Sequence, residues 1–328
     1  MTAPVNVLYL TGFDSTNAAL LVAPDDARLF TDFRYAERAR EVEGVEFEET
    51  PRYMYTDLPS LLPPRIAFEA DAMTYANYEF LRRGGIELEP RRGLVESLRV
   101  IKEPEELDAI RRAAAVTDAT YERFAEERFE GRTEKDLVWR MEQLFHECGA
   151  DGLAFPVDIA SGPTAASPHA EPGDRVVSEG DLVLVDAGAK VGGYCSDSTR
   201  MFGVGAVSES LREVHEIVRR AQQAGLDAVR AGVATRDVDA AARAVIADAG
   251  YGENFGHGLG HGLGLLVHEA PGLRPESGDV LAAGNVVTVE PGIYLSGVAG
   301  IRIEDLVIVT EDGAEVLSSF TKELMTVH

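Results

Sequence analysis

The sequence predicts an α/β (α+β) protein with two domains: a small N-terminal α/β domain at residues 1–102 and a larger domain at residues 103–328. Three observations support this prediction. The chain has 328 residues, which exceeds one typical domain. Before residue 102, short strand-like runs alternate with helical runs. After residue 102, helix and strand signals recur at a nearly constant separation, which indicates an internal repeat.

The N-terminal region is expected to combine strands with helices. Strands are predicted for four short apolar runs that are bounded by Gly, Pro or Asp, namely NVLYL, AALLVA, ARLFTD and RIAFEA. The segments YAERAREVEG and TYANYEFLRRGG have a helical composition and end in glycine. This region contains no histidine. We therefore expect it to shape access or assembly rather than to carry out chemistry.

A helix start marks the domain boundary. Pro104 suits the first turn of a helix, and Glu103, Glu105 and Glu106 interact favourably with the N-terminal end of the helix dipole. Apolar residues then follow in steps of three and four, at Leu107, Ile110, Ala114, Thr117, Tyr121 and Phe124. A long amphipathic helix is therefore expected to open the second domain.

The second domain is predicted to consist of two related halves. Each half has a glycine that ends a long helix, a threonine that caps the next helix and a glycine that stops it. These residues are Gly131, Thr133 and Gly149 in the first half and Gly232, Thr235 and Gly250 in the second. The strand run GDLVLVDAG also matches GNVVTVEPG, and their acidic residues, Asp186 and Glu290, lie 104 residues apart. We expect a pseudo-twofold axis to bring Asp186 and Glu290 together.

Composition excludes several classes of partner. The formal net charge is −25, from 56 acidic and 31 basic residues, and such a surface repels nucleic acid. The chain start lacks the basic and apolar parts of a signal peptide, and no run of 18 apolar residues occurs, so no membrane association is expected. Nothing suggests that Cys148 pairs with Cys195. A cytoplasmic protein is therefore expected.

Five residues of metal-binding types lie in or beside short apolar runs, namely Asp186, Asp197, His261, Glu290 and Glu304. A buried carboxylate is costly unless a cation meets it, and one arginine, Arg302, lies nearby. Four carboxylates and an imidazole carry too much negative charge for one divalent ion. They suit two ions that share bridging carboxylates, the arrangement that activates a water for hydrolysis. The pattern predicts a two-metal hydrolase.

Local spacing supports this grouping. Asp186 ends the run DLVLVD, and a hairpin through AGAKVGGY returns to Asp197, so adjacent antiparallel strands can place both carboxylates on one face. In GIRIEDLVIV, Arg302 and Glu304 share one face of a strand, whereas Asp305 faces away. We therefore expect Glu304 to be the ligand, with Arg302 orienting it or steadying its charge. A purely structural pair between Arg302 and Glu304 is the alternative.

The glycine-rich segment GHGLGHGLGLLVHEAP carries His257, His261 and His268. Its small residues let the backbone or a substrate approach these imidazoles closely. A neutral imidazole can bind a metal, whereas a neighbouring histidine can donate a hydrogen bond to a developing oxyanion. Spacing alone does not assign these roles.

These blocks resemble the signature of the creatinase/aminopeptidase P/prolidase family of metallopeptidases, which has the pita-bread fold. The resemblance rests on DLVLVDAGAKVGGYCSDSTR, GHGLGHGLGLLVHEAP, TVEPGIYL and GIRIEDLVIV, and it covers nearly the whole chain. The N-terminal region, including FTDFRY, is similar to the small N-terminal domain of that family. The resemblance implies a proline-containing peptide substrate and a homodimer.

The resemblance also implies the role of each site residue. Asp186 would bind one ion, Asp197 and Glu304 would bridge two ions, and His261 and Glu290 would complete the coordination of the second ion. The two divalent ions are expected to be manganese, with cobalt or zinc as alternatives.

The same resemblance implies that Glu290 is the general base. The block ASGPTAASPHAEPGD resembles one that carries a further active-site histidine, here His169. His257 and His268 match histidines that bind the scissile carbonyl or stabilise the tetrahedral intermediate, and Arg302 completes the expected catalytic set.

Substrate length separates the two functions that the family suggests. In this family a segment of the form HExP corresponds to residues 268–271 of this chain, which read HEAP. Many prolidases have an arginine directly after that segment, where it holds the carboxylate of a dipeptide. Here that position is Gly272, and the nearest basic residue is Arg274. We therefore expect an Xaa-Pro aminopeptidase, with an Xaa-Pro dipeptidase as the alternative. An inactive binding protein of the same fold is a third possibility, which the five filled ligand positions disfavour.

Overall fold

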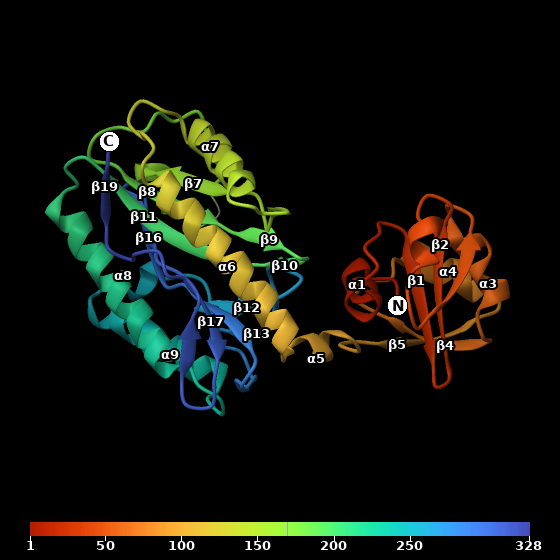
Figure 1. The fold of residues 1–328 in the computed structure, drawn as a ribbon. Coiled ribbons are helices and arrows are strands. Elements are labelled where there is room, and N and C mark those ends of the chain that lie inside the picture. Colours follow the sequence, from red (N-terminus) through yellow and green to blue (C-terminus); the bar gives the residue numbers. More distant parts are fainter. Residues whose placement is uncertain (169) are drawn as a thin grey trace. The chain divides into compact units, whose positions relative to one another are not determined.

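The computed structural model describes residues 1–168 and 170–328, and it divides the chain into two compact units, Met1–Leu98 and Arg99–His328 (Figure 1). The predicted fold class is confirmed: a small α/β unit precedes a larger unit of helices and mostly antiparallel sheets. Among the described residues, no helix is both long enough and apolar enough to cross a membrane.

The first unit is built on two small sheets. β1 (Ala18–Ala23) pairs with β2 (Asp26–Asp32) in antiparallel fashion, and β3 (Glu46–Thr50) joins β2 in parallel. β4 (Arg65–Glu69) and β5 (Glu87–Arg91) form a parallel pair. The helical segments are α1 (Pro4–Thr11), α2 (Ala36–Ala39), η1 (Met54–Thr56), α3 (Leu58–Leu61), α4 (Tyr75–Arg83) and α5 (Glu96–Arg99). The predictions of β1, β2, β4 and α4 are confirmed.

The predicted strand NVLYL is wrong, because these residues belong to helix α1. Pro4 stands in the first turn of the helix, and Gly12 ends it in the left-handed conformation with a φ of 68°. A short apolar run suits a buried helix as well as a strand, so its flanking residues decide. The helix predicted for YAERAREVEG is also much shorter than expected, since α2 covers four residues.

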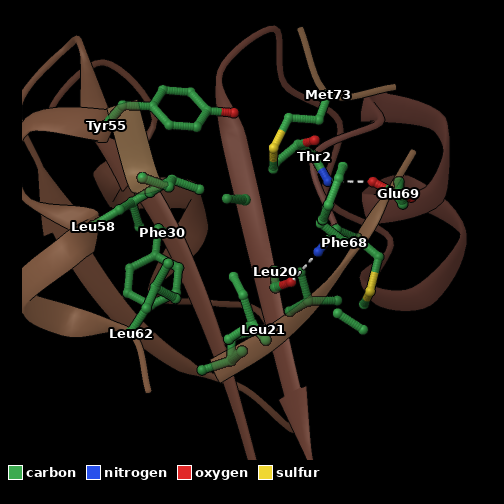
Figure 2. Close-up of a pocket in the computed structure, with 15 residues that line it drawn as sticks. Thr2, Leu20, Leu21, Phe30, Tyr55, Leu58, Leu62, Phe68, Glu69 and Met73 are labelled. Atoms are coloured by element: carbon green, nitrogen blue, oxygen red, sulfur yellow. Dashed lines mark hydrogen bonds between the residues drawn. The ribbon is translucent and has the colours of Figure 1, made fainter. Parts of the chain in front are cut away.

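A small cavity of about 40 Å³ lies in the core of the first unit (Figure 2). Its walls are mostly apolar and include Leu20, Phe30 and Leu58, whereas Glu69 supplies a carboxylate at one side. This volume suits one or a few water molecules and is far below that of a peptide site.

The second unit contains four long helices: α6 (Pro104–Phe124), α7 (Glu134–Glu147), α8 (Glu209–Ala228) and α9 (Thr235–Asp248). The predicted start of α6 is confirmed, and Glu106 accepts a hydrogen bond from the backbone of Glu103. Thr133 caps α7 as predicted, by accepting a hydrogen bond from the backbone of Asp136. Both α6 and α8 end earlier than predicted, several residues before Gly131 and Gly232.

The predicted cap at Thr235 is wrong by one residue, since Ala234 is the N-cap of α9. The Thr235 hydroxyl donates instead to Ser277 Oγ, at 2.8 Å, and also reaches the carbonyl oxygen of Asp279. The Thr235 hydroxyl therefore contacts Ser277, which is distant in sequence, in place of the local capping contact that was predicted.

Two sheets form the centre of this unit. The first has the order β19 (Met325–Val327), β11 (Ser198–Val204), β8 (Leu182–Ala187) and β7 (Asp158–Ser161). The second has the order β13 (Glu269–Leu273), β12 (Gly260–Gly262), β14 (Val286–Val289), β17 (Asp305–Val309) and β18 (Ala314–Val316). Shorter elements are β6 (Gly152–Leu153), η2 (Gly162–Ala166), β9 (Ala189–Val191), β10 (Tyr194–Cys195), η3 (Gly252–Asn254), β15 (Gly292–Leu295) and β16 (Ala299–Arg302).

The predicted repeat is visible in this topology. The matched runs form β8 and β14, and each lies between two antiparallel neighbours, β7 and β11 in the first half and β12 and β17 in the second. The bridge between Thr133 and Val176 likewise corresponds to the bridge between Ala234 and Val280.

Both faces of β8 are buried, which explains its continuous apolar run. Val183 and Val185 pack in the core that contains α6 and α7, whereas Leu182 and Leu184 pack in the core that contains α8 and α9. Figure 1 shows these helix pairs around the sheets. The strand that carries Asp186 is thus fixed from both sides.

A buried ion pair joins the two halves. The Arg200 side chain, 2% exposed, donates from Nη2 to Asp305 Oδ1 at 2.8 Å, and it also donates to the carbonyl oxygen of Phe320. Asp305, at the start of β17, accepts further hydrogen bonds from Gln222 and Lys322. The ion pair between Arg200 and Asp305 therefore links β11 to β17 next to Glu304.

We predict that Asp305→Ala lowers the free energy of unfolding by about 3–5 kcal/mol, because it leaves the Arg200 charge buried without its carboxylate. Denaturant titration measures this change. The matched control is Glu315→Ala, which breaks the exposed pair with Arg111 and should cost less than about 1 kcal/mol. Equal losses in the two variants would contradict the assigned role of the buried pair.

Candidate metal centre

A cleft of about 930 Å³ opens in the second unit. It is lined by every predicted site residue that the structure describes: Asp186, Asp197, His257, His261, His268, Glu290, Arg302 and Glu304. His169, the remaining predicted residue, lies outside the described residues. Residues far apart in the sequence therefore meet in one cleft.

The first half contributes two aspartates from neighbouring strands. Asp186 lies near the end of β8 and is directly opposite Thr199 of β11. Asp197 immediately precedes β11, after the hairpin formed by β9 and β10. Antiparallel pairing thus brings both carboxylates to the cleft, as the spacing predicted.

The second half contributes His261 and Glu290 from adjacent strands. Gly260 lets β12 approach β14 closely, because a Cβ atom at this position would lie 2.0 Å from the carbonyl oxygen of Thr288. The Thr288 hydroxyl accepts a hydrogen bond from the backbone of His261 and donates to Glu290 Oε1, at 3.0 Å. One threonine therefore positions both residues.

Asp197, His261 and Glu304 form a group suited to a metal ion, because each offers a ligand atom within 4.8 Å of the others. His261 Nε2 lies 3.7 Å from Asp197 Oδ2 and 3.2 Å from Glu290 Oε1. His261 Nδ1 lies 3.1 Å from the carbonyl oxygen of Gly262, which can only accept a hydrogen bond. Nδ1 therefore carries a proton, and Nε2 is turned towards the carboxylates, as in metal-bound histidines.

Three buried carboxylate oxygens fit a bound cation. Among the described residues, Asp186 Oδ1, Asp197 Oδ1 and Glu304 Oε1 accept no hydrogen bond. Buried carboxylate oxygens without a donor are costly, and divalent cations readily bind oxygen and imidazole ligands. The donor set thus suits a divalent metal.

Burial and mutual repulsion govern the ionisation of these groups. The pKa values of Asp197 and Glu304 are raised well above the ordinary range, first by burial and then by neighbouring carboxylates. Burial also raises the pKa of Asp186, although Arg302 opposes this effect. For Glu290, burial raises the pKa, but the hydrogen bond and charge of His261 outweigh it and bring the pKa to about 2.

Arg302 pairs with Asp186, at 2.6 Å between Nη2 and Oδ2, and it reaches Glu304 through the Thr199 hydroxyl. Its charge opposes the rise in the pKa of Glu304 that burial causes, which agrees with the expected steadying role. The alternative of a direct structural pair between Arg302 and Glu304 is not seen among the described residues. The predicted strand GIRIEDLVIV breaks between β16 and β17, which turns Arg302 towards the first half and leaves Asp305 outside the cleft.

Tyr294 is a cleft residue that the sequence did not reveal. Its hydroxyl accepts a hydrogen bond from Arg302 Nη1 at 2.9 Å and lies 3.0 Å from His257 Nε2. His257 Nδ1 donates to the carbonyl oxygen of Gly258, and burial lowers the pKa of this histidine. A neutral His257 therefore accepts from Tyr294 through Nε2. The available signal was a tyrosine four residues after Glu290 within an apolar run.

The sequence also did not reveal how the segment after His268 is held. Glu269 lines the cleft and pairs with the buried side chain of Arg99, and its second oxygen lies 3.6 Å from Lys102 Nζ. Glu269 also accepts a hydrogen bond from the backbone of Leu266. These contacts fix the chain on both sides of His268.

Comparison with known proteins places this geometry in a family. A model of metallopeptidase family M24 matches residues 108–311, and a model of the creatinase/prolidase N-terminal domain matches residues 1–101.

Solved structures agree with these matches. An Xaa-Pro dipeptidase from Bacillus anthracis has a TM-score of 0.96 and 37% identity, covering 99% of this chain and 94% of that chain. An X-Pro aminopeptidase from Thermotoga maritima has a TM-score of 0.91 and 32% identity, with the same coverage. A prolidase from Pyrococcus furiosus has a TM-score of 0.93 and 34% identity, covering 98% of this chain and 95% of that chain. The resemblance read from the sequence motifs is confirmed.

We predict that metal binding releases protons and strengthens as pH rises. The raised pKa values of Asp197 and Glu304 mean that protons compete with the metal, and this competition fades above those pKa values. Calorimetric titration of manganese in buffers of different ionisation enthalpy counts the protons released. Affinity that stays constant as the pH is lowered would contradict this prediction.

Proposed function

The chain belongs to metallopeptidase family M24 and is a metallo-exopeptidase, and we propose that it is an Xaa-Pro dipeptidase. It would hydrolyse the bond before a C-terminal proline in a dipeptide. Within the chain, residues 1–102 would shape access or assembly, and residues 103–328 would carry the chemistry.

The proposed centre holds two divalent cations, with manganese as the expected metal. Asp186 and Asp197 from the first half, with His261, Glu290 and Glu304 from the second, would be the ligands. When bound there, the cations would polarise the peptide carbonyl and lower the pKa of a water, so that it can lose a proton and act as the nucleophile. Oxygen-rich coordination supports manganese over zinc.

The residues of the chain would then move the proton and steady the charge. Glu290 would accept the proton of the attacking water and pass it to the proline nitrogen. His268 lies edge-on to His261, with 4.3 Å between ring centroids, and would donate to the carbonyl oxygen. His257 accepts from Tyr294 in this arrangement, which favours His268 as the oxyanion donor.

The observation that carries the dipeptidase proposal is the position of Arg274 in the cleft. A Cβ atom at Gly272 would lie 3.5 Å from Arg274 Nε, and one at Gly258 would lie 2.9 Å from Arg274 Cβ. Gly258 thus makes room for this arginine, and the first of these distances places its guanidinium group beside Gly272. A guanidinium can hold a carboxylate through two parallel hydrogen bonds, which would recognise the C-terminus of a dipeptide.

The sequence favoured an Xaa-Pro aminopeptidase, because Gly272 replaces the arginine of many prolidases. The comparisons support the alternative better, since the Bacillus anthracis and Pyrococcus furiosus structures are an Xaa-Pro dipeptidase and a prolidase. Arg274 explains how Gly272 is compatible with dipeptide binding, because its guanidinium group reaches the same part of the cleft.

We also propose a cytoplasmic homodimer. Cys148 and Cys195 are both free, which suits a reducing compartment. In the first unit, Phe33 and Tyr75 are 70% and 76% exposed, and a second subunit would cover such aromatic side chains.

We predict that Arg274→Ala lowers kcat/KM for alanyl-proline by about 10- to 100-fold, because charge-assisted hydrogen bonds to the carboxylate are lost. Alanyl-prolinamide, which lacks that carboxylate, should be hydrolysed equally by both proteins. The control is Arg236→Ala, which removes an exposed arginine from α9. If the wild type hydrolyses alanyl-prolyl-alanine as well as the dipeptide, the aminopeptidase alternative is correct.

We predict that His268→Ala lowers kcat by roughly 100-fold while both metals are retained, because an oxyanion donor is removed. Steady-state kinetics and metal analysis after dialysis measure the two effects. His146→Ala, on the exposed face of α7, is the control. Loss of metal in the His268 variant would make this residue a ligand instead.

A further inference from the structure

Asp158, the first residue of β7, lies on the wall of the cleft and was not among the expected site residues. It is directly opposite Asp186 in the antiparallel pairing of β7 with β8. Directly opposed residues project from the same face of a sheet, and Thr199 continues this row on β11. The row therefore places a second carboxylate beside Asp186.

This carboxylate has no cationic partner among the residues that the structure describes. Asp158 Oδ1 is buried and accepts no hydrogen bond. Arg302 donates to Asp186, and although burial raises the pKa of Asp158, the nearby charge of Arg302 only opposes that rise and forms no ion pair with Asp158 among the described residues. Like charges directly opposite each other destabilise a sheet, and a cation at Asp158 would offset this cost.

Asp158 is not one of the five residues expected to bind the metals. It is also absent from the group whose ligand atoms lie within 4.8 Å of one another, which consists of Asp197, His261 and Glu304. Beside Asp158, the cleft wall is formed by Phe155, Pro156 and Val157, which are apolar. A carboxylate at the end of an apolar wall suits an organic cation, whose carbon atoms can lie against these side chains.

We propose that Asp158 binds a cationic group of the substrate, at a subsite beside the metal centre. The cation is either the α-ammonium group of the dipeptide or the basic side chain of the residue before proline. This assignment rests on the proposed function for the identity of the substrate, and on the cleft geometry for the charge of the subsite.

Three small ligands separate the two sources of positive charge. Lysine and norleucine differ in the side-chain ammonium group, whereas norleucine and hexanoate differ in the α-ammonium group. All three carry a carboxylate, so the contacts of that carboxylate cancel in the ratios of their dissociation constants, and the comparison of wild type with the Asp158 variants isolates the part that depends on Asp158. Calorimetry on the manganese-loaded full chain gives these constants without requiring turnover.

Asp158→Asn removes the charge while keeping the shape of the side chain, and Asp158→Glu retains the charge. The matched control is Glu171→Gln, which removes an equal charge from an exposed residue of the same cleft. Metal analysis of each variant tests whether Asp158 contributes to the metal centre.

We expect Asp158→Asn to reduce one of the two preferences, for lysine over norleucine or for norleucine over hexanoate, by about tenfold in the ratio of dissociation constants. Tenfold is the usual scale for a hydrogen bond between charged groups. Loss of the lysine preference over norleucine identifies a side-chain subsite, and loss of the norleucine preference over hexanoate identifies an α-ammonium subsite. Asp158→Glu should restore part of the preference, and Glu171→Gln should leave both ratios unchanged. Unchanged ratios in Asp158→Asn, or loss of metal, would overturn the proposal.

Hydrolysis of lysyl-proline and norleucyl-proline by the same proteins tests the proposed function separately. If the wild type hydrolyses neither dipeptide while the Asp158-dependent ratio persists, the subsite stands and the dipeptidase proposal fails. If both dipeptides are hydrolysed while the ratios are independent of Asp158, the dipeptidase proposal stands and the subsite fails.

Discussion

Repulsion among buried carboxylates is the constraint on which the rest of this structure depends. Asp186, Asp197, Glu290 and Glu304 line one cleft and raise one another's cost of ionisation. Arg302 is paired with Asp186 and therefore offsets part of this charge. A rigid frame is needed to hold such groups together, and strands buried on both faces provide it. The same repulsion makes the cleft a strong acceptor of cations.

The internal repeat provides this frame, but its two halves have diverged in chemistry. β8 and β14 are equivalent strands. β8 carries Asp186, β14 is followed by Glu290, and both acidic residues line the cleft. The first half contributes aspartates, whereas the second contributes a histidine and glutamates. Thr199 and Thr288 are the small hydroxyl residues that connect these groups, through Arg302 and Glu304 in one case and His261 and Glu290 in the other. Duplication thus explains the symmetry of the scaffold and not the asymmetry of the site.

Sequence patterns predicted what local chemistry determines. Capping at Thr133, the apolar strand β8 and the acidic residues beside apolar runs all have signals within a few residues. The patterns failed where distant contacts decide. Thr235 donates to Ser277, and Arg302, the last residue of β16, pairs with Asp186 of the other half. Tyr294 and Asp158 had no periodic signal, since Tyr294 is a tyrosine in an apolar strand and Asp158 is a single acid at the start of another strand.

The neighbouring residues Glu304 and Asp305 divide two tasks between them. Asp305 is fastened to the permanent charge of Arg200, whereas Glu304 faces the cleft. The joint between the halves is therefore independent of whatever occupies the cleft. A chain without bound ions can therefore keep this joint, because none of these contacts of Asp305 involves a side chain of the group suited to a metal ion.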